Sequence, residues 1–134
     1  MSVTDPVLAG LAARLRSLTE GIAREVCLVV PIRDGVYTEP VVVSIGSLTS
    51  VLVAPSTVFR PALRLRASQV LVAHNHLDAS PVTDQDRAVT RRLVAAGVLL
   101  GVPMRVHLVL GPVGWIDCCQ SGEVWIPYPG EAAA

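Results

Sequence analysis

Apolar residues recur along the chain with two different periods, and each period predicts a kind of element. Spacings of three or four residues predict helices over about 6–18, 56–67 and 83–96. Short runs rich in β-branched residues predict strands at 26–32, 36–44, 69–73, 104–110, 115–119 and 124–126. Asp34-Gly35 predicts a hairpin between the first two strands. This order of elements predicts an α/β fold in which helices pack against a mixed sheet.

Residues that start and stop helices refine these limits. Thr4 or Asp5 can cap the first helix, and Ser56 is the candidate cap of the second. Pro61 lies inside the second helical pattern, which predicts a kink there or a start later than Ser56. Gly97 stands where the third helix is expected to end in a glycine cap.

The chain's most distinctive polar group follows the strand predicted at 69–73. His74 and His76 are separated by one residue, so in an extended segment their side chains point to the same side. Thr83-x-x-Asp86 opens the next predicted helix, which places Asp86 in the first turn, facing back towards the histidines. Two imidazoles and a carboxylate are a zinc-ligand set of the open, catalytic kind, with a fourth position left for water.

Each part of this pattern also has a simpler explanation. A Ser/Thr-x-x-Asp/Glu motif before an apolar helix is a common cap, and caps far outnumber metal sites. A lone His-x-His pair is weak evidence for metal ligands. The two interpretations are compatible, because a cap fixes the helix start that carries Asp86 towards the histidines. We expect His107, in the middle of a predicted strand, to be structural and not a ligand.

Composition narrows the class of protein. The 134 residues suffice for one domain with a core, and they contain no repeat or interdomain linker. Basic and acidic residues balance at 11 each, so tight nucleic-acid binding is not favoured. No apolar run reaches the ~18 residues of a membrane span, and we predict a cytoplasmic protein. The sequence leaves the oligomeric state open, although apolar edge strands are compatible with a homodimer. The cysteines fit a reducing compartment: Cys27, Cys118 and Cys119.

Several motifs together carry a resemblance to a known family. They are His74-Asn75-His76, Thr83-x-x-Asp86, the Ala-Ala-Gly-Val-Leu-Leu-Gly run at 95–101, and the upstream stretches 45–50 and 55–62. The combination resembles the RadC-like branch of the JAB/MPN (JAMM) metalloprotease superfamily, over about residues 25–111. The resemblance implies a curved mixed sheet flanked by helices, in a cytidine deaminase-like architecture. It implies a single domain over 1–134, with its core at about 25–127 after an N-terminal helix.

The resemblance also implies an activity. Members of this superfamily hydrolyse peptide or isopeptide bonds with a zinc-activated water, and one zinc ion per chain is expected. His74, His76 and Asp86 would be the zinc ligands. Thr83 stands where the family has a serine that helps to stabilise the oxyanion, and Glu25 matches the general base. The implied substrate is a peptide or a ubiquitin-like or sulfur-carrier-like protein.

Some features keep other interpretations open. Spacing alone does not select Glu25 over Glu20 or Glu39 as the base. Thr83 replaces the family's serine, Leu77 stands where proline is common, and the loop from 76 to 83 is one residue shorter than usual. Asp78 and Asp84 are alternative ligands, although each also suits a loop or a helix N-terminus. Two other functions therefore compete: a catalytically inactive interaction module with the same fold, and a DNA-repair-associated protein.

Overall fold

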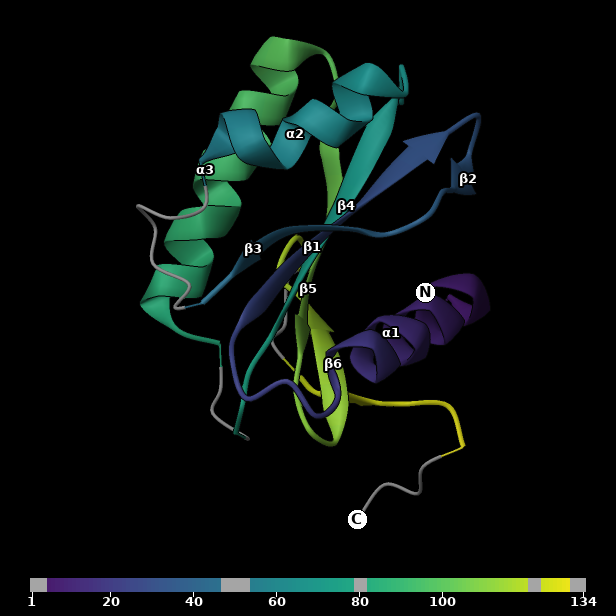
Figure 1. Cartoon of the computed structure of the whole chain (residues 1–134), viewed down its shortest axis with the longest axis vertical. Helices are drawn as coiled ribbons and strands as arrows, with labels where there is room; N and C mark the ends of the chain where they lie inside the picture. The colour runs from purple at the N-terminus through teal and green to yellow at the C-terminus, as the bar shows by residue number, and fades with distance from the viewer. Residues whose placement is uncertain (1–4, 47–53, 79–81, 121–123, 131–134) are drawn as a thin grey trace.

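The computed structural model describes residues 5–46, 54–78, 82–120 and 124–130, and within them three helices surround one curved sheet (Figure 1). In chain order the elements are α1 (Pro6–Thr19), β1 (Val26–Arg33), β2 (Val36–Tyr37), β3 (Val41–Ile45), α2 (Pro55–Arg64), β4 (Gln69–Asn75), α3 (Asp84–Leu100), β5 (Met104–Leu110), β6 (Gly114–Asp117) and β7 (Ile126–Pro127). The predicted α/β class with a mixed, curved sheet is confirmed. None of the described helices is long and apolar enough to cross a membrane.

The sheet is mixed because one of its strand pairs is parallel. Its strands follow the order β2-β1-β4-β5-β6-β7, and β3 also pairs with β1. β4 and β5 run parallel and are joined by α3, whereas the other pairs are antiparallel. The predicted hairpin is present, but its second strand is split into β2 and β3 by residues 38–40. The last of these is Pro40, which has no N–H for a ladder.

Two apolar clusters cover the two faces of the sheet. Even-numbered residues of β1 pack with α1 on one face, while Cys27 and Val29 pack with α2 and α3 on the other. This division follows from the two-residue period of a strand. β1 is buried along almost its whole length, and burial raises the pKa of the Cys27 thiol to about 12. Cys27 is therefore a small core residue rather than a reactive thiol.

Helix α2 departs from its prediction at both ends. It begins at Pro55 with Ala54 as its N-cap, so Ser56 is not the cap, and it ends at Arg64 instead of residue 67. Pro61 lies inside the helix and neither delays its start nor ends it. The bond that Pro61 cannot make would go to the carbonyl of Thr57, on an exposed residue where water can satisfy it.

Helix α3 extends past the residue predicted to end it. It continues to Leu100, and Gly101, with φ of 73°, forms the left-handed C-cap. Gly97 lies within the helix, where a Cβ atom would come within 2.8 Å of the Val102 carbonyl oxygen and 3.0 Å of the Met104 nitrogen. The prediction that Gly97 caps the helix is therefore wrong: this glycine permits a close approach between α3 and the start of β5.

We expect Gly97→Ala to destabilise the fold by about 1–3 kcal/mol, because its methyl group would meet backbone atoms that cannot turn aside. Gly10→Ala is the matched control, since Gly10 is an exposed residue of helix α1 with no atom within 4 Å of the added carbon. This control should be stabilised by about 0.5–1 kcal/mol. Urea unfolding measures both, and equal effects would refute the role of close packing at Gly97.

Candidate metal centre

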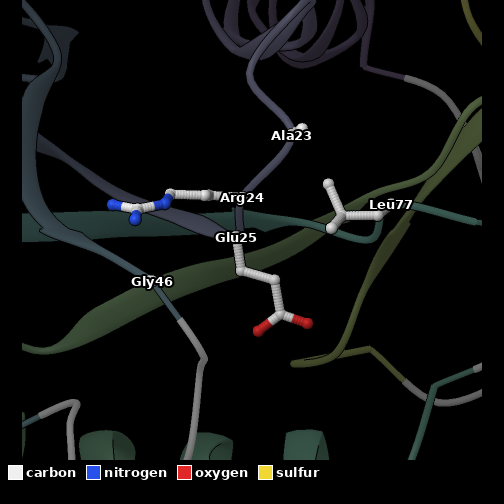
Figure 2. A pocket seen from close by; sticks show the side chains of 5 residues that line it. All are labelled: Ala23, Arg24, Glu25, Gly46 and Leu77. Atoms are coloured by element: carbon white, nitrogen blue, oxygen red, sulfur yellow. The ribbon is translucent and has the colours of Figure 1, made fainter.

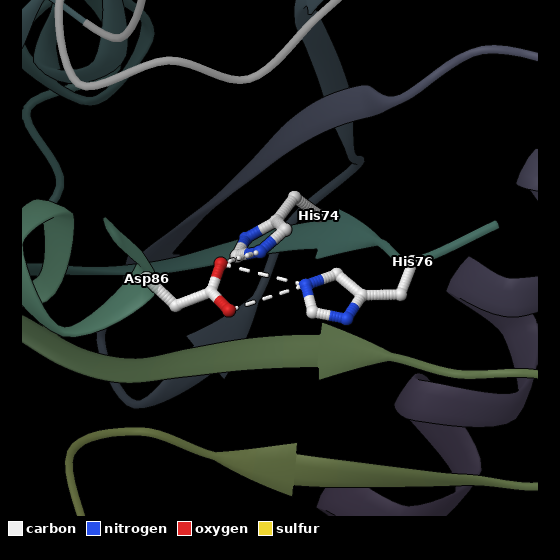
Figure 3. A group of neighbouring side chains, drawn as sticks. All are labelled: His74, His76 and Asp86. Atoms are coloured by element: carbon white, nitrogen blue, oxygen red, sulfur yellow. Dashed lines mark hydrogen bonds and ion pairs between the residues drawn. The ribbon is translucent and has the colours of Figure 1, made fainter. Parts of the chain in front are cut away.

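Strand β4 and helix α3 bring the three predicted ligand residues together (Figure 3). His74 Nε2 lies 2.9 Å from Asp86 Oδ1, and His76 Nε2 lies 3.2 Å from Asp86 Oδ2. The ligand atoms of all three residues lie within 4.8 Å of one another. In the part of the chain that the structure describes, His74, His76 and Asp86 form the one group of His, Cys, Asp and Glu side chains that could hold a metal ion.

Strand geometry keeps the two histidines on one side. β4 extends through His74 to Asn75, two residues beyond the predicted strand, and the backbone N–H of His76 donates to the Leu110 carbonyl at 2.8 Å. This bond continues the pairing with β5, so the chain stays extended through His76. Figure 3 shows both imidazoles pointing from this segment towards the carboxylate of Asp86.

A capping box fixes the position of Asp86. The backbone N–H of Asp86 donates to Thr83 Oγ1 at 3.1 Å, and the backbone N–H of Thr83 donates to Asp86 Oδ2 at 2.7 Å. The predicted cap is thus present, and the same carboxylate faces both histidines. The Asp86 side chain thus takes part in the helix cap and in the ligand group at the same time.

The electrostatics of the group suit a cation. Burial raises the pKa of Asp86, but hydrogen bonds to the two histidines and to the Thr83 backbone outweigh it and hold the pKa well below its usual range. Asp86 is therefore ionised at neutral pH. An ionised carboxylate beside two imidazole nitrogens matches the donor set of an open zinc site, so these residues fit a divalent metal.

Glu25 lies beside this group. A pocket of about 270 Å³ is lined by Glu25, both histidines, Thr83 and Asp86 together with neighbouring residues. A second pocket, of about 490 Å³, adjoins it and shares Glu25 and Leu77 (Figure 2). In Figure 2 the Glu25 carboxylate points into the space between Gly46 and Leu77. Glu25 therefore stands at the junction of the two pockets.

The two other glutamates considered from the sequence lie elsewhere. Glu39 forms an exposed ion pair with Arg14 at 2.8 Å. Glu20 is near His76 in a different pocket, and its carboxylate lies 3.7 Å from the Arg16 side chain. Neither lines the pocket that contains the three ligand residues. The structure therefore distinguishes Glu25 by position, which sequence spacing could not do.

Asn75, the residue between the histidines, holds the segment that carries Glu25. Its side-chain oxygen accepts from the backbone N–H of Val26 at 2.6 Å, and its side-chain nitrogen donates to the Arg24 carbonyl at 3.1 Å. These bonds flank Glu25 on both sides. Sequence reasoning did not predict this role, although the same period that aligns the histidines places Asn75 on the opposite side of the strand.

His107 contacts His74 but is not a member of the candidate ligand group. Its Nε2 lies 3.0 Å from His74 Nδ1, and its Nδ1 lies 2.5 Å from the hydroxyl of Thr90. Complete burial lowers the pKa of His107 to about 3, so the ring is neutral at pH 7. His107 is a buried strand residue, as expected, but its contact with His74 and that of Thr90 were not predicted.

The other acidic residues near the loop are not in the ligand group. Asp84 occupies the first turn of α3, where an acid suits the positive end of the helix dipole, and its carboxylate lies 2.8 Å from Arg87 Nη1. Asp78 is exposed and lines the smaller pocket. Cys118 and Cys119 are free thiols, and burial raises their pKa values to about 12 and about 11.

Comparison with known proteins identifies the family. The sequence profile of the RadC-like JAB domain matches residues 4–120. The chain belongs to the RadC-like JAB domain family. The resemblance inferred from the motifs is therefore confirmed, and the sheet and helices of this RadC-like domain agree with the JAB/MPN fold.

Curated relatives agree with this assignment. A UPF0758 protein of Symbiobacterium thermophilum is 43% identical over 81 residues, which are 60% of this chain and 35% of the relative. Another, from Protochlamydia amoebophila, is 41% identical over 77 residues, or 57% of this chain and 33% of the relative. A third, from Acaryochloris marina, is 30% identical over 133 residues, or 96% and 53%. The RadC-like domain thus matches about a third to a half of the length of these relatives.

We expect Thr83→Ala to destabilise the protein by about 1 kcal/mol through loss of the cap. Ser56→Ala is the control, because Ser56 is exposed at the start of α2 but does not cap it, and its effect should stay within about 0.5 kcal/mol. Both are measured by urea unfolding in the presence of a chelator, so that bound metal does not contribute. Equal losses would show that the capping box adds no stability.

Proposed function

We propose that this RadC-like domain is a zinc-dependent peptidase of the JAMM type that hydrolyses a peptide or isopeptide bond. The observation that carries the proposal is the convergence of His74, His76 and Asp86, with ligand atoms within 4.8 Å of one another, in a pocket that Glu25 also lines. Membership of the JAB family supports the same chemistry. Zinc is inferred from the ligand types, two imidazoles and one carboxylate.

The zinc ligands and Glu25 would have different roles in the proposed reaction. When bound, zinc lowers the pKa of water from about 15.7 to about 7, which makes hydroxide available at neutral pH. Glu25, which is not a member of the ligand group, would accept the proton of the attacking water and pass it to the leaving amine. The carboxylate of Glu25 faces the shared space of the two pockets, where a substrate backbone can lie.

Thr83 would assist as a hydroxyl donor to the developing oxyanion. In the structure its hydroxyl donates to Asp86 Oδ2 at 3.0 Å and accepts from the backbone N–H of Asp86 at 3.1 Å. The proposed role therefore requires the hydroxyl hydrogen to turn from the carboxylate to the substrate, whereas the accepting bond that caps α3 can remain.

The size of the larger pocket supports a polypeptide substrate. The larger hollow, of about 490 Å³, adjoins the ligand group through Glu25 and Leu77. This volume accommodates a few residues of a peptide chain next to the scissile bond. We propose a peptide or the C-terminal segment of a ubiquitin-like or sulfur-carrier-like protein as the substrate class, acting in the cytoplasm.

The first test is zinc content, measured by elemental analysis on protein purified without a metal-binding tag. We expect about one zinc per chain in the wild type and almost none in His76→Ala, which removes one of three ligands. Thr57→Ala, an exposed substitution on α2, should bind as the wild type does. A wild-type protein that stays zinc-free after zinc is added back would refute the proposed function.

The second test separates an enzyme from a metal-binding module. Zinc-loaded protein is incubated with a library of linear peptides and with peptides branched through a lysine ε-amine, and products are identified by mass spectrometry. Glu25→Gln should keep its zinc but cleave about 10²–10⁴-fold more slowly, as loss of a general base implies. Glu39→Gln changes a surface ion pair and should cleave normally.

Two outcomes would count against the peptidase. Zinc binding without cleavage of either library would favour the interaction module. Undiminished cleavage by Glu25→Gln would remove Glu25 from the mechanism while leaving the zinc site intact.

A further inference from the structure

A series of polar contacts links two residues of the candidate metal centre through residues outside it. It begins at His74, whose Nδ1 is 3.0 Å from Nε2 of His107. The other ring nitrogen of His107, Nδ1, is 2.5 Å from the Thr90 hydroxyl oxygen. That hydroxyl donates to the backbone carbonyl of Asp86 at 2.8 Å. These contacts therefore run from the ligand residue His74 through His107 and Thr90, which are not ligands, to the backbone of the ligand residue Asp86.

The members of this series are held in place. His107 is 0% exposed, His74 is 2% exposed and Thr90 is 8% exposed, so bulk water does not compete for their polar atoms. The backbone N–H of His107 donates to the Asp117 carboxylate at 3.1 Å, and its carbonyl accepts from the Cys118 N–H at 2.7 Å. The imidazole of His107 thus projects from a fixed point of β5 towards His74.

A metal ion bound at His74 Nε2 would determine the direction of the two hydrogen bonds that His107 makes through its ring nitrogens. The ion would take the lone pair of His74 Nε2, so neutral His74 would carry its proton on Nδ1. That proton would point at Nε2 of His107, which must then be an acceptor. The proton of neutral His107 would consequently lie on Nδ1 and point at Thr90. The Thr90 oxygen can accept it because its own hydrogen is directed to the Asp86 carbonyl.

We propose that His107 and Thr90 are positioning residues that hold His74 in the tautomer with its Nε2 lone pair turned to the metal. The assignment rests on the zinc site of the proposed function and adds two residues to it that do not touch the metal. Outer contacts of this kind orient a ligand imidazole and increase its basicity.

The first experiment observes the tautomers directly. The chain contains three histidines, all in this cluster, so ¹⁵N-histidine labelling gives three ring systems to assign. In long-range ¹H–¹⁵N spectra of the zinc-loaded protein, His74 and His107 should both carry their proton on Nδ1. A proton on Nε2 of zinc-loaded His107 would overturn the proposal, because that nitrogen could not accept from His74.

The second experiment compares two substitutions at position 107. His107→Gln can place an amide oxygen close to the former Nε2 position and accept the His74 proton. His107→Leu fills similar volume with no acceptor. Zinc affinity, measured by chelator competition, should fall about 10–100-fold in the leucine variant and remain within a few-fold of wild type in the glutamine variant. Equal losses in the two variants, or none in either, would overturn the proposal.

A second pair of variants keeps the test decisive if His107→Leu does not fold. Thr90→Val keeps the shape of the side chain but removes the acceptor for His107, whereas Thr90→Ser keeps the hydroxyl. The valine variant should bind zinc several-fold more weakly than the serine variant, and equal affinities would contradict the assignment. A wild type that binds no zinc would refute the proposed function, and the assignment with it; wild-type binding with unchanged variants would refute only the assignment.

Discussion

The Asp86 carboxylate is the group on which the start of α3 and the candidate metal centre both depend. Its Oδ2 accepts from the backbone and the hydroxyl of Thr83, while its Oδ1 faces His74. The helix cap therefore aims the carboxylate, and the histidines keep it ionised. Threonine supplies the same capping hydroxyl as serine, so the cap forms with either residue and fixes the direction of the Asp86 side chain at the start of α3.

Strand β4 is the second constraint. Its two-residue period directs His74 and His76 to the metal side and Asn75 to the segment that carries Glu25. A shift of β4 by one residue would exchange these sides. The histidines would then leave the metal side, and Asn75 would lose its bonds to the segment that carries Glu25. The ladders with β1 and β5 on its two edges prevent such a shift. The ligand pair and the proposed base are thus placed relative to each other by one strand.

Local patterns predicted much of the centre from the sequence. The one-residue separation of His74 and His76 and the capping motif at Thr83 depend on neighbouring residues only, and both arrangements are present in the structure. Contacts between distant segments were not predictable in this way. His74 meets His107, 33 residues later, because β4 and β5 pair in a particular register. No local signal in the sequence specifies that register.

The errors in the helices have the same origin. Gly97 and Gly101 are four residues apart, and each alone is a plausible helix stop. Only the approach of α3 to the start of β5 shows that one provides space and the other provides the left-handed turn. At α2, the helix begins one residue earlier, at Pro55 with Ala54 as its N-cap, so Ser56 lies inside it although its residue type suits a cap.

The polar contacts from Asp86 through His74, His107 and Thr90 back to the Asp86 carbonyl form a closed ring. The ring joins the first two turns of α3 to β4 and β5. Helix ends ordinarily open and close independently of the rest of a protein, so their amide hydrogens exchange early. Here the first turns of α3 cannot open without breaking the ring. We therefore expect the amide hydrogens at the beginning of this helix to exchange in the same cooperative unit as those of the central strands.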